Sequence, residues 1–168
     1  MHLHARSSSA GISIVESSIA VAISVLFLSS VFTMNISTMD SIRGSKESVA
    51  ASQVLQQRVE SLRIANWQQI TSASWLKTNS LNTSAAGSEV LKNLTETLTL
   101  EPYGSGNVGN TKLVRSSAGT TTIVSQNAGL LTENAVKVIW TAVYNGAPNN
   151  RTVSRQIVAI LAKGGVAK

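Results

Sequence analysis

The sequence has no cysteine and little histidine or aspartate, which removes several kinds of chemistry. Without a thiol there is no disulfide framework, thiolate nucleophile or cysteine zinc site. The two histidines are His2 and His4, and Asp40 is the only aspartate. The chain after His4 therefore has no histidine that could act as the base of a Ser–His–Asp triad. A Ser–Lys pair stays open by composition, but no pattern places one. The dispersed glutamates lack the close alternating spacing of a calcium loop, and we expect no enzyme, metal site, cofactor or small-molecule substrate.

Charge is missing from a long stretch near the N-terminus. Glu16 is the only charged residue between Arg6 and Asp40, and residues 17–39 carry none. No proline or glycine interrupts the stretch, although serines and threonines moderate its hydropathy. A helix needs about 20 mainly apolar residues to cross a bilayer core, and an uncharged run of this length is unusual for a buried helix in a soluble protein. We therefore expect a membrane-spanning helix.

The order of the parts around this stretch differs from that of a secretory signal. Such a signal places small residues at a cleavage site after its apolar segment, whereas here the small residues 7–11 come before it. Cleavage there would leave the apolar segment on the mature protein. Glu16 then lies one turn into the segment, where a carboxylate costs on the order of 2.5–3.5 kcal/mol unless it is paired or near the interface. An uncleaved single-pass anchor is the alternative.

Gly11, followed by Ile12-Ser13-Ile14-Val15-Glu16 and the uncharged run, resembles the N-terminus of the type IV pilin-like family: pilins, minor pilins and type II secretion pseudopilins. The resemblance implies cleavage after Gly11 by a prepilin peptidase and N-methylation of the new N-terminus, Ile12. It also implies an assembly role for Glu16, which would meet the N-terminal amine of a neighbouring subunit. Two positions depart from the family pattern: Ile12 replaces the usual Phe, and Thr33 stands where main pilins often carry a proline.

The resemblance implies a structural subunit, a minor pilin or pseudopilin, of a type IV pilus or type II secretion filament. Its expected partners are other pilin or pseudopilin subunits, the prepilin peptidase and the bacterial inner membrane. Arg6 precedes the span, which predicts a cytoplasmic N-terminus and a periplasmic C-terminal part. The expected divisions are a leader (1–11), a transmembrane and filament-core helix (12–39), an amphipathic continuation (40–66), and a loop with an exported sheet domain (67–168).

Helical character is expected to continue beyond Asp40. Residues 45–65 are rich in strong helix formers without proline, and Leu55, Val59 and Leu62 form an apolar stripe at i, i+4 and i+7. Glu60 is expected to support the polar face with Arg63 or Arg58. A bend is expected at Gly44, since glycine costs about 1 kcal/mol within a helix.

The period changes to two after Val90, which predicts strands. The strand candidates are residues 94–100, 111–115, 120–125, 134–144 and 152–162, the last two forming a hairpin. Trp140 and Ile157 are expected on its buried faces. Residues 66–87 are expected to form a loop with short helical turns, pinned to the domain by Trp67 and Trp75. The predicted fold class is α+β: a long N-terminal helix packed on a small antiparallel sheet, as in pilins.

The charge balance leaves an alternative function open. The formal net charge is +6, which suits an anionic partner, but the basic residues are dispersed and a solvated surface is the favoured interpretation. The segment 104–109 matches G-x-G-x-x-G, but a nucleotide fingerprint needs a preceding strand and a following helix. Residues 111–115 look like another strand, so a flexible strand connection is the favoured interpretation. A pilin-like module that captures DNA or another anionic ligand through its basic domain is the alternative, although nothing specific supports nucleic acid. Steep salt dependence of affinity would distinguish it.

Overall fold

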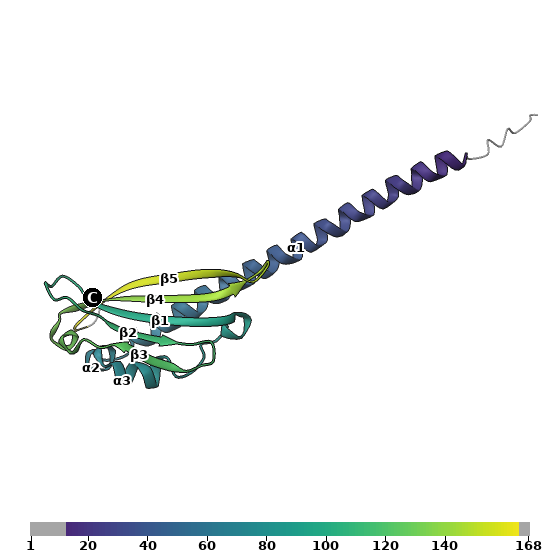
Figure 1. Cartoon of the computed structure of the whole chain (residues 1–168). Coiled ribbons are helices and arrows are strands. Elements are labelled where there is room, and N and C mark those ends of the chain that lie inside the picture. Colours follow the sequence, from purple (N-terminus) through teal and green to yellow (C-terminus); the bar gives the residue numbers. More distant parts are fainter. Residues whose placement is uncertain (1–12, 165–168) are drawn as a thin grey trace, which may run out of the picture. The chain divides into compact units, whose positions relative to one another are not determined.

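The computed structural model describes residues 13–164 and divides the chain into two compact units, which meet between Asp40 and Ser41 (Figure 1). The helices are α1 (Ile14–Arg63), α2 (Trp67–Thr71), α3 (Ala73–Trp75), the π-helical turn η1 (Leu76–Ser80) and the 3-10 turns η2 (Ser88–Val90) and η3 (Ala128–Thr132). The strands are β1 (Lys92–Pro102), β2 (Thr111–Arg115), β3 (Thr121–Ser125), β4 (Ala135–Gly146) and β5 (Arg151–Ala162). The predicted α+β fold, a long helix packed on an antiparallel sheet, is confirmed.

Helix α1 runs for 50 residues without interruption, because proline is absent from it and its single glycine, Gly44, stays in helical geometry. The bend expected at Gly44 does not divide the helix. The predicted apolar stripe is buried in the second unit, where Leu55, Val59 and Leu62 are at most 3% exposed. The helix ends at Arg63 rather than near Asn66, because Asn66 caps the next helix instead.

Short capped helices occupy the segment that was expected to be mainly a loop. The Asn66 side chain accepts a bond from Gln69 N, and the Gln69 side chain accepts one from Asn66 N, which makes a complete capping box for α2. Trp67 Nε1 donates to Leu131 O at 3.0 Å, and Trp75 packs against the core. Both tryptophans therefore hold this segment on the domain, as expected.

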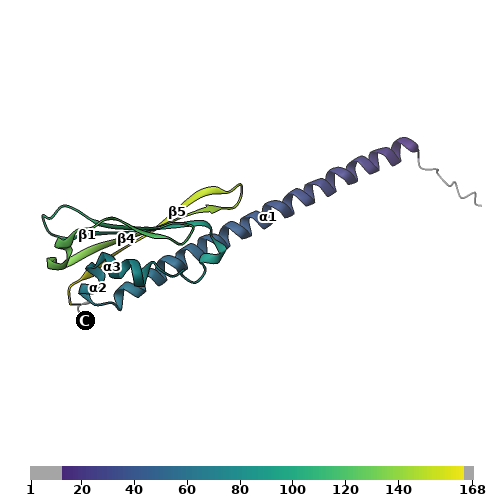
Figure 2. The same ribbon diagram turned by 60° about the horizontal axis from the view of Figure 1, so that its bottom comes forward.

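The five strands form one antiparallel sheet in the order β3-β2-β1-β4-β5. All five predicted strands are present, each within two residues of its expected bounds. Figure 2 shows the sheet from its edge, with the second-unit part of α1, α2 and α3 along one face. Strand β4 alternates strictly between buried and half-buried residues, as expected for a strand with one face on a core.

The core lies between this face of the sheet and the helices. Trp140 is fully buried, and Ile157 is half-buried and packs against the same core, so both predicted face assignments are confirmed. Leu62 of α1 and Leu98 of β1 are also completely buried. The sheet face is thus closed by residues from α1 as well as by its own large side chains.

The G-x-G-x-x-G segment connects β1 to β2 and its residues are exposed. It leads directly into strand β2, with no helix after it. The positive φ of 77° at Gly104 and 124° at Gly109 suits a flexible turn. The strand–turn–helix context of a nucleotide-binding fingerprint is therefore not present here.

Candidate functional site

The first unit contains the stretch singled out for membrane insertion. Among the described residues, α1 is the one helix long and apolar enough to cross a membrane, and none of its apolar window is buried in the protein. Large apolar side chains point outward all along it; Leu26, Phe27 and Met34 are between 68% and 73% exposed. Apolar exposure of this kind needs either lipid or other protein surfaces to cover it.

Five hydroxyl side chains within this stretch form hydrogen bonds inside the helix. The hydroxyls of Ser18, Ser24, Ser29, Thr33 and Thr38 each donate to the carbonyl oxygen four residues earlier, at 2.8–2.9 Å. An unpaired hydroxyl in an apolar medium costs several kcal/mol on alkane-based scales, and these bonds remove that cost. These five serines and threonines are therefore compatible with a bilayer core.

Glu16 lies in the first turn of α1, where the helix dipole favours a negative charge. Its side chain is exposed, and it has no ion-pair partner within residues 13–164. The predicted processing residues, Gly11 and Ile12, lie outside the described residues. The roles expected for these three residues therefore stay predictions.

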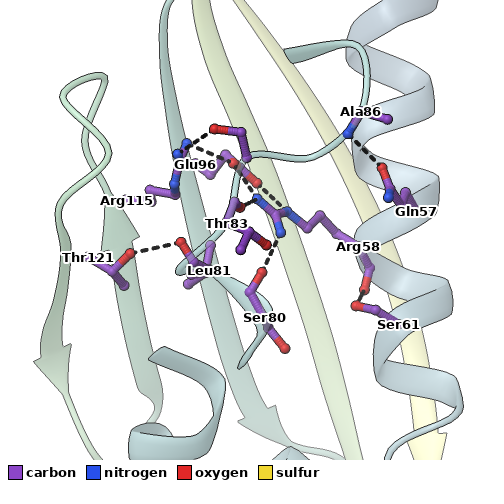
Figure 3. A network of polar contacts seen from close by, with 11 residues as sticks. Gln57, Arg58, Ser61, Ser80, Leu81, Thr83, Ala86, Glu96, Arg115 and Thr121 are labelled. Carbon is purple, nitrogen blue, oxygen red and sulfur yellow. Dashed lines mark hydrogen bonds and ion pairs between the residues drawn. The ribbon is translucent and has the colours of Figure 1, made fainter. Parts of the chain in front are cut away.

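A buried charged cluster in the second unit was not predicted. It consists of Arg58 of α1, Glu96 of β1 and Arg115 of β2 (Figure 3). Arg58 donates from Nε to Glu96 Oε2 at 2.8 Å and from Nη2 to Oε1 at 2.9 Å, and Arg115 Nη1 lies 3.5 Å from Oε1. Glu96 is fully buried, and the two arginines are 5% and 8% exposed. A paired geometry of this kind offsets the high cost of burying each charge.

Arg58 also ties α1 to the segment before β1. Its guanidinium donates to the carbonyl oxygens of Ser80 and Thr83. The same guanidinium lies 5.8 Å from the centroid of the Trp140 ring, within cation–π range. One side chain therefore joins α1, the loop after η1, β1 and β4.

The expectation that basic residues face solvent is wrong for Arg58 and Arg115. Arg58 does not support the polar face with Glu60; the exposed partner of Glu60 is Arg63, at 2.7 Å. The reason is position: Arg58 follows Leu55 by three residues and precedes Leu62 by four, so it belongs to the buried stripe.

The sequence did contain a signal for the cluster. Glu96 alternates in phase with Leu94, Leu98 and Leu100, which places its carboxylate on the buried face of β1. Arg115 is directly opposite Glu96 in the β1–β2 register. An acid in phase with a row of leucines predicts a buried ion-pair partner, because an unpaired charge there is too costly.

The described part of the chain shows no cluster of side chains suited to binding a metal ion. Within residues 13–164, no three histidine, aspartate or glutamate side chains come together in a way that could hold a metal ion. Two other glutamates form bonds between distant segments: Glu133 accepts from Asn107 Nδ2, and Glu47 accepts from Ala147 N at 2.8 Å. These contacts are structural ties between segments.

The arrangement as a whole is compatible with a pilin-like fold, since a long N-terminal apolar helix leads into a small antiparallel sheet. Two features therefore stand out. One is a lipid-compatible helix with one carboxylate in its first turn, and the other is a charged cluster that anchors α1 to the domain. A scan of protein-family models, a search of curated proteins and a search of solved structures each found no match to this chain.

Proposed function

We propose that this protein is a structural, non-catalytic subunit of a filament of the type IV pilus or type II secretion kind, a minor pilin or pseudopilin. The observation that carries the proposal is helix α1. Its N-terminal half exposes apolar side chains with internally bonded hydroxyls, and its C-terminal half buries a stripe in a folded domain. One helix thus serves both lipid or filament packing and domain folding.

The proposed location is the bacterial inner membrane, crossed once by α1. The N-terminus is cytoplasmic in this proposal, because Arg6 precedes the span. The sheet domain is then periplasmic, and the helix enters the filament core when the subunit assembles. The prepilin peptidase would remove residues 1–11, so that Ile12 becomes the methylated N-terminus.

Glu16 has a specific role in this proposal. A carboxylate one turn into the span is costly in lipid, and it has no ion-pair partner among the described residues of its own chain. The N-terminal amine of Ile12 on an adjacent subunit would supply the missing positive charge. In a medium of low dielectric constant this attraction is much stronger than in water, so the pairing would favour the assembled state over the lipid-embedded subunit.

The test compares Glu16→Ala and Glu16→Gln with the native chain in its host. Both variants should insert and be processed normally, because removing a buried charge eases insertion. Their recovery with sheared filaments, or crosslinked to a partner pilin, should fall sharply. Glu60→Ala is the matched control, since Glu60 is an exposed glutamate on the same helix outside the span. Normal incorporation of both Glu16 variants would refute the assembly role.

Processing is tested separately by intact-mass and N-terminal analysis of the protein from its host. We expect loss of residues 1–11 and addition of one methyl group on Ile12. Gly11→Leu should block the cleavage and leave the full-length chain in the membrane. A mature protein that still begins at Met1, or that begins after Ile36, would contradict the pilin-like proposal.

A further inference from the structure

The buried cluster of Arg58, Glu96 and Arg115 is not electrically balanced. It holds two guanidinium groups against one carboxylate, and all three side chains are at least nine-tenths buried. Arg58 uses each of its three nitrogens, with two bonds to Glu96 and two to backbone carbonyls. Arg115 does not: its bond to Glu96 is long, at 3.5 Å, and its Nε has no hydrogen-bond partner. The excess positive charge therefore belongs to Arg115.

Arg115 lines a polar pocket on the domain surface. The pocket has a volume of about 430 Å³ and lies between η2, the start of β1 and the turn after β2. Its lining residues include Ser84, Ser88 and Ser117, and Arg115 Nη2 donates to Ser84 Oγ at 2.9 Å. A hydroxyl that accepts from the guanidinium keeps its own hydrogen for a further acceptor. Positive charge and hydroxyl donors thus converge on one space.

Asn93 brings an amide to the same pocket. The register of β1 against β4 shifts between Lys92 and Thr95, and Asn93 has a φ of 54° in the left-handed region. An irregularity of this kind redirects a side chain out of the ordinary strand alternation. Asn93 thus lines the pocket from the irregular start of β1.

We propose that this pocket binds a compact oxyanion, either a carboxylate or a phosphate group. Guanidinium groups bind both with strong charge-assisted hydrogen bonds, and a bound anion would balance the surplus charge of the cluster. Glu89 also lines the pocket, and its carboxylate opposes a second negative charge. Glu89 is exposed, so it weakens binding without closing the site. This inference is independent of filament assembly.

The experiment uses the full chain in non-ionic detergent micelles, titrated with inorganic phosphate or with acetate at ionic strength held constant by sodium chloride. Two-dimensional ¹H–¹⁵N spectra report the Arg115 Nε–H group and the amides of Ser84, Asn93 and Ser117. We expect saturable shifts at these groups. Saturation with phosphate alone identifies a phosphate site, with acetate alone a carboxylate site, and with both a general oxyanion site.

Variants distinguish an effect on anion binding in the pocket from an effect on folding of the domain. Arg115→Met should abolish the saturable response, and Glu89→Gln should tighten binding several-fold. Since Arg115→Met also alters the cluster, Ser117→Glu is the second variant: Ser117 is exposed, and a tethered carboxylate there should occupy the pocket and remove the response. Ser105→Glu, in the exposed β1–β2 connection, is the matched control and should titrate like the native chain.

Two results would overturn the proposal. One is a linear, non-saturating response to both anions, or shifts confined to exposed lysines, which would mean an adventitious ion only. The other is an unchanged titration in folded Ser117→Glu, which would place the anion elsewhere.

Discussion

Glu96→Gln should destabilise the domain far more than the same change at Glu60, although the two ion pairs have nearly the same length. The Arg58–Glu96 distance is 2.8 Å and the Arg63–Glu60 distance is 2.7 Å. The side chains of the first pair are 7% and 0% exposed, whereas those of the second are 52% and 63% exposed. The comparison therefore sets a buried carboxylate held by two arginines against an exposed carboxylate held by one, at nearly the same shortest distance.

The expected magnitudes follow from what each substitution leaves behind. Glu96→Gln leaves two buried guanidinium groups without a counter-charge, and removing one partner of a buried pair costs roughly 3–5 kcal/mol. Glu60→Gln leaves one solvated arginine, and an exposed pair contributes about 0.2–1 kcal/mol. For a domain of this size, each kcal/mol lowers Tm by roughly 3–4 °C, so Glu96→Gln should lower Tm by roughly 10 °C or more.

The assay is thermal and urea unfolding of the full chain in non-ionic detergent. Near-ultraviolet circular dichroism is the suitable signal, because Trp140 lies under the Arg58 guanidinium and the apolar part of α1 stays helical in the micelle. A triple change, Arg58→Met with Glu96→Leu and Arg115→Met, should recover most of the lost stability, since apolar replacement of buried ion pairs is often neutral. A Glu96→Gln cost within 1 kcal/mol of the Glu60→Gln cost would refute the reasoning.

Three further substitutions test the packing and the local ties. Trp140→Ala should cost about 3–5 kcal/mol because Trp140 is fully buried, and half-buried Trp75→Ala should cost clearly less; equal Tm values would mean that the β4 face is wrongly assigned. Glu47→Ala should speed hydrogen exchange at the Ala147 amide, whose acceptor is Glu47 Oε2, while Glu47→Gln keeps an acceptor and most of the protection; unchanged exchange in both would exclude this bond. Asn66→Ala should cost about 1 kcal/mol through loss of the α2 cap, whereas Asn66→Asp should stay near the native stability in the same unfolding assay.

The strands could be predicted because a strand with one buried face has a period of two, which β4 keeps over its whole length and β1 keeps from Leu94 to Glu101. The α1 stripe followed in the same way from its i, i+4, i+7 spacing. The short helices after Asn66 were harder, because each is only one or two turns long and depends on local caps more than on periodicity. Chain order alone also could not show that β1 lies between β2 and β4.

One part of the candidate site could be predicted without the order of the strands in the sheet, and the other part could not. Glu16 stands out locally, as a lone charge in an apolar run. The Arg58–Glu96–Arg115 cluster joins a helix and two strands, so it needs the tertiary arrangement as well as the phase of each element. The sequence showed that Glu96 alternates in phase with the buried leucines of β1. It did not show that β1 pairs with β2, which sets Glu96 opposite Arg115.

The strand order also has a kinetic consequence. Strands β4 and β5 pair along their full length as a hairpin, and β1 and β2 pair as another, so both can form while the rest of the chain is unfolded. The contact of β1 with β4, which sets Leu98 opposite Trp140, must close the long intervening segment first, and such closure slows folding. Changes at Leu98 or Trp140, which weaken the contact closed in this slow step, should therefore slow the folding rate.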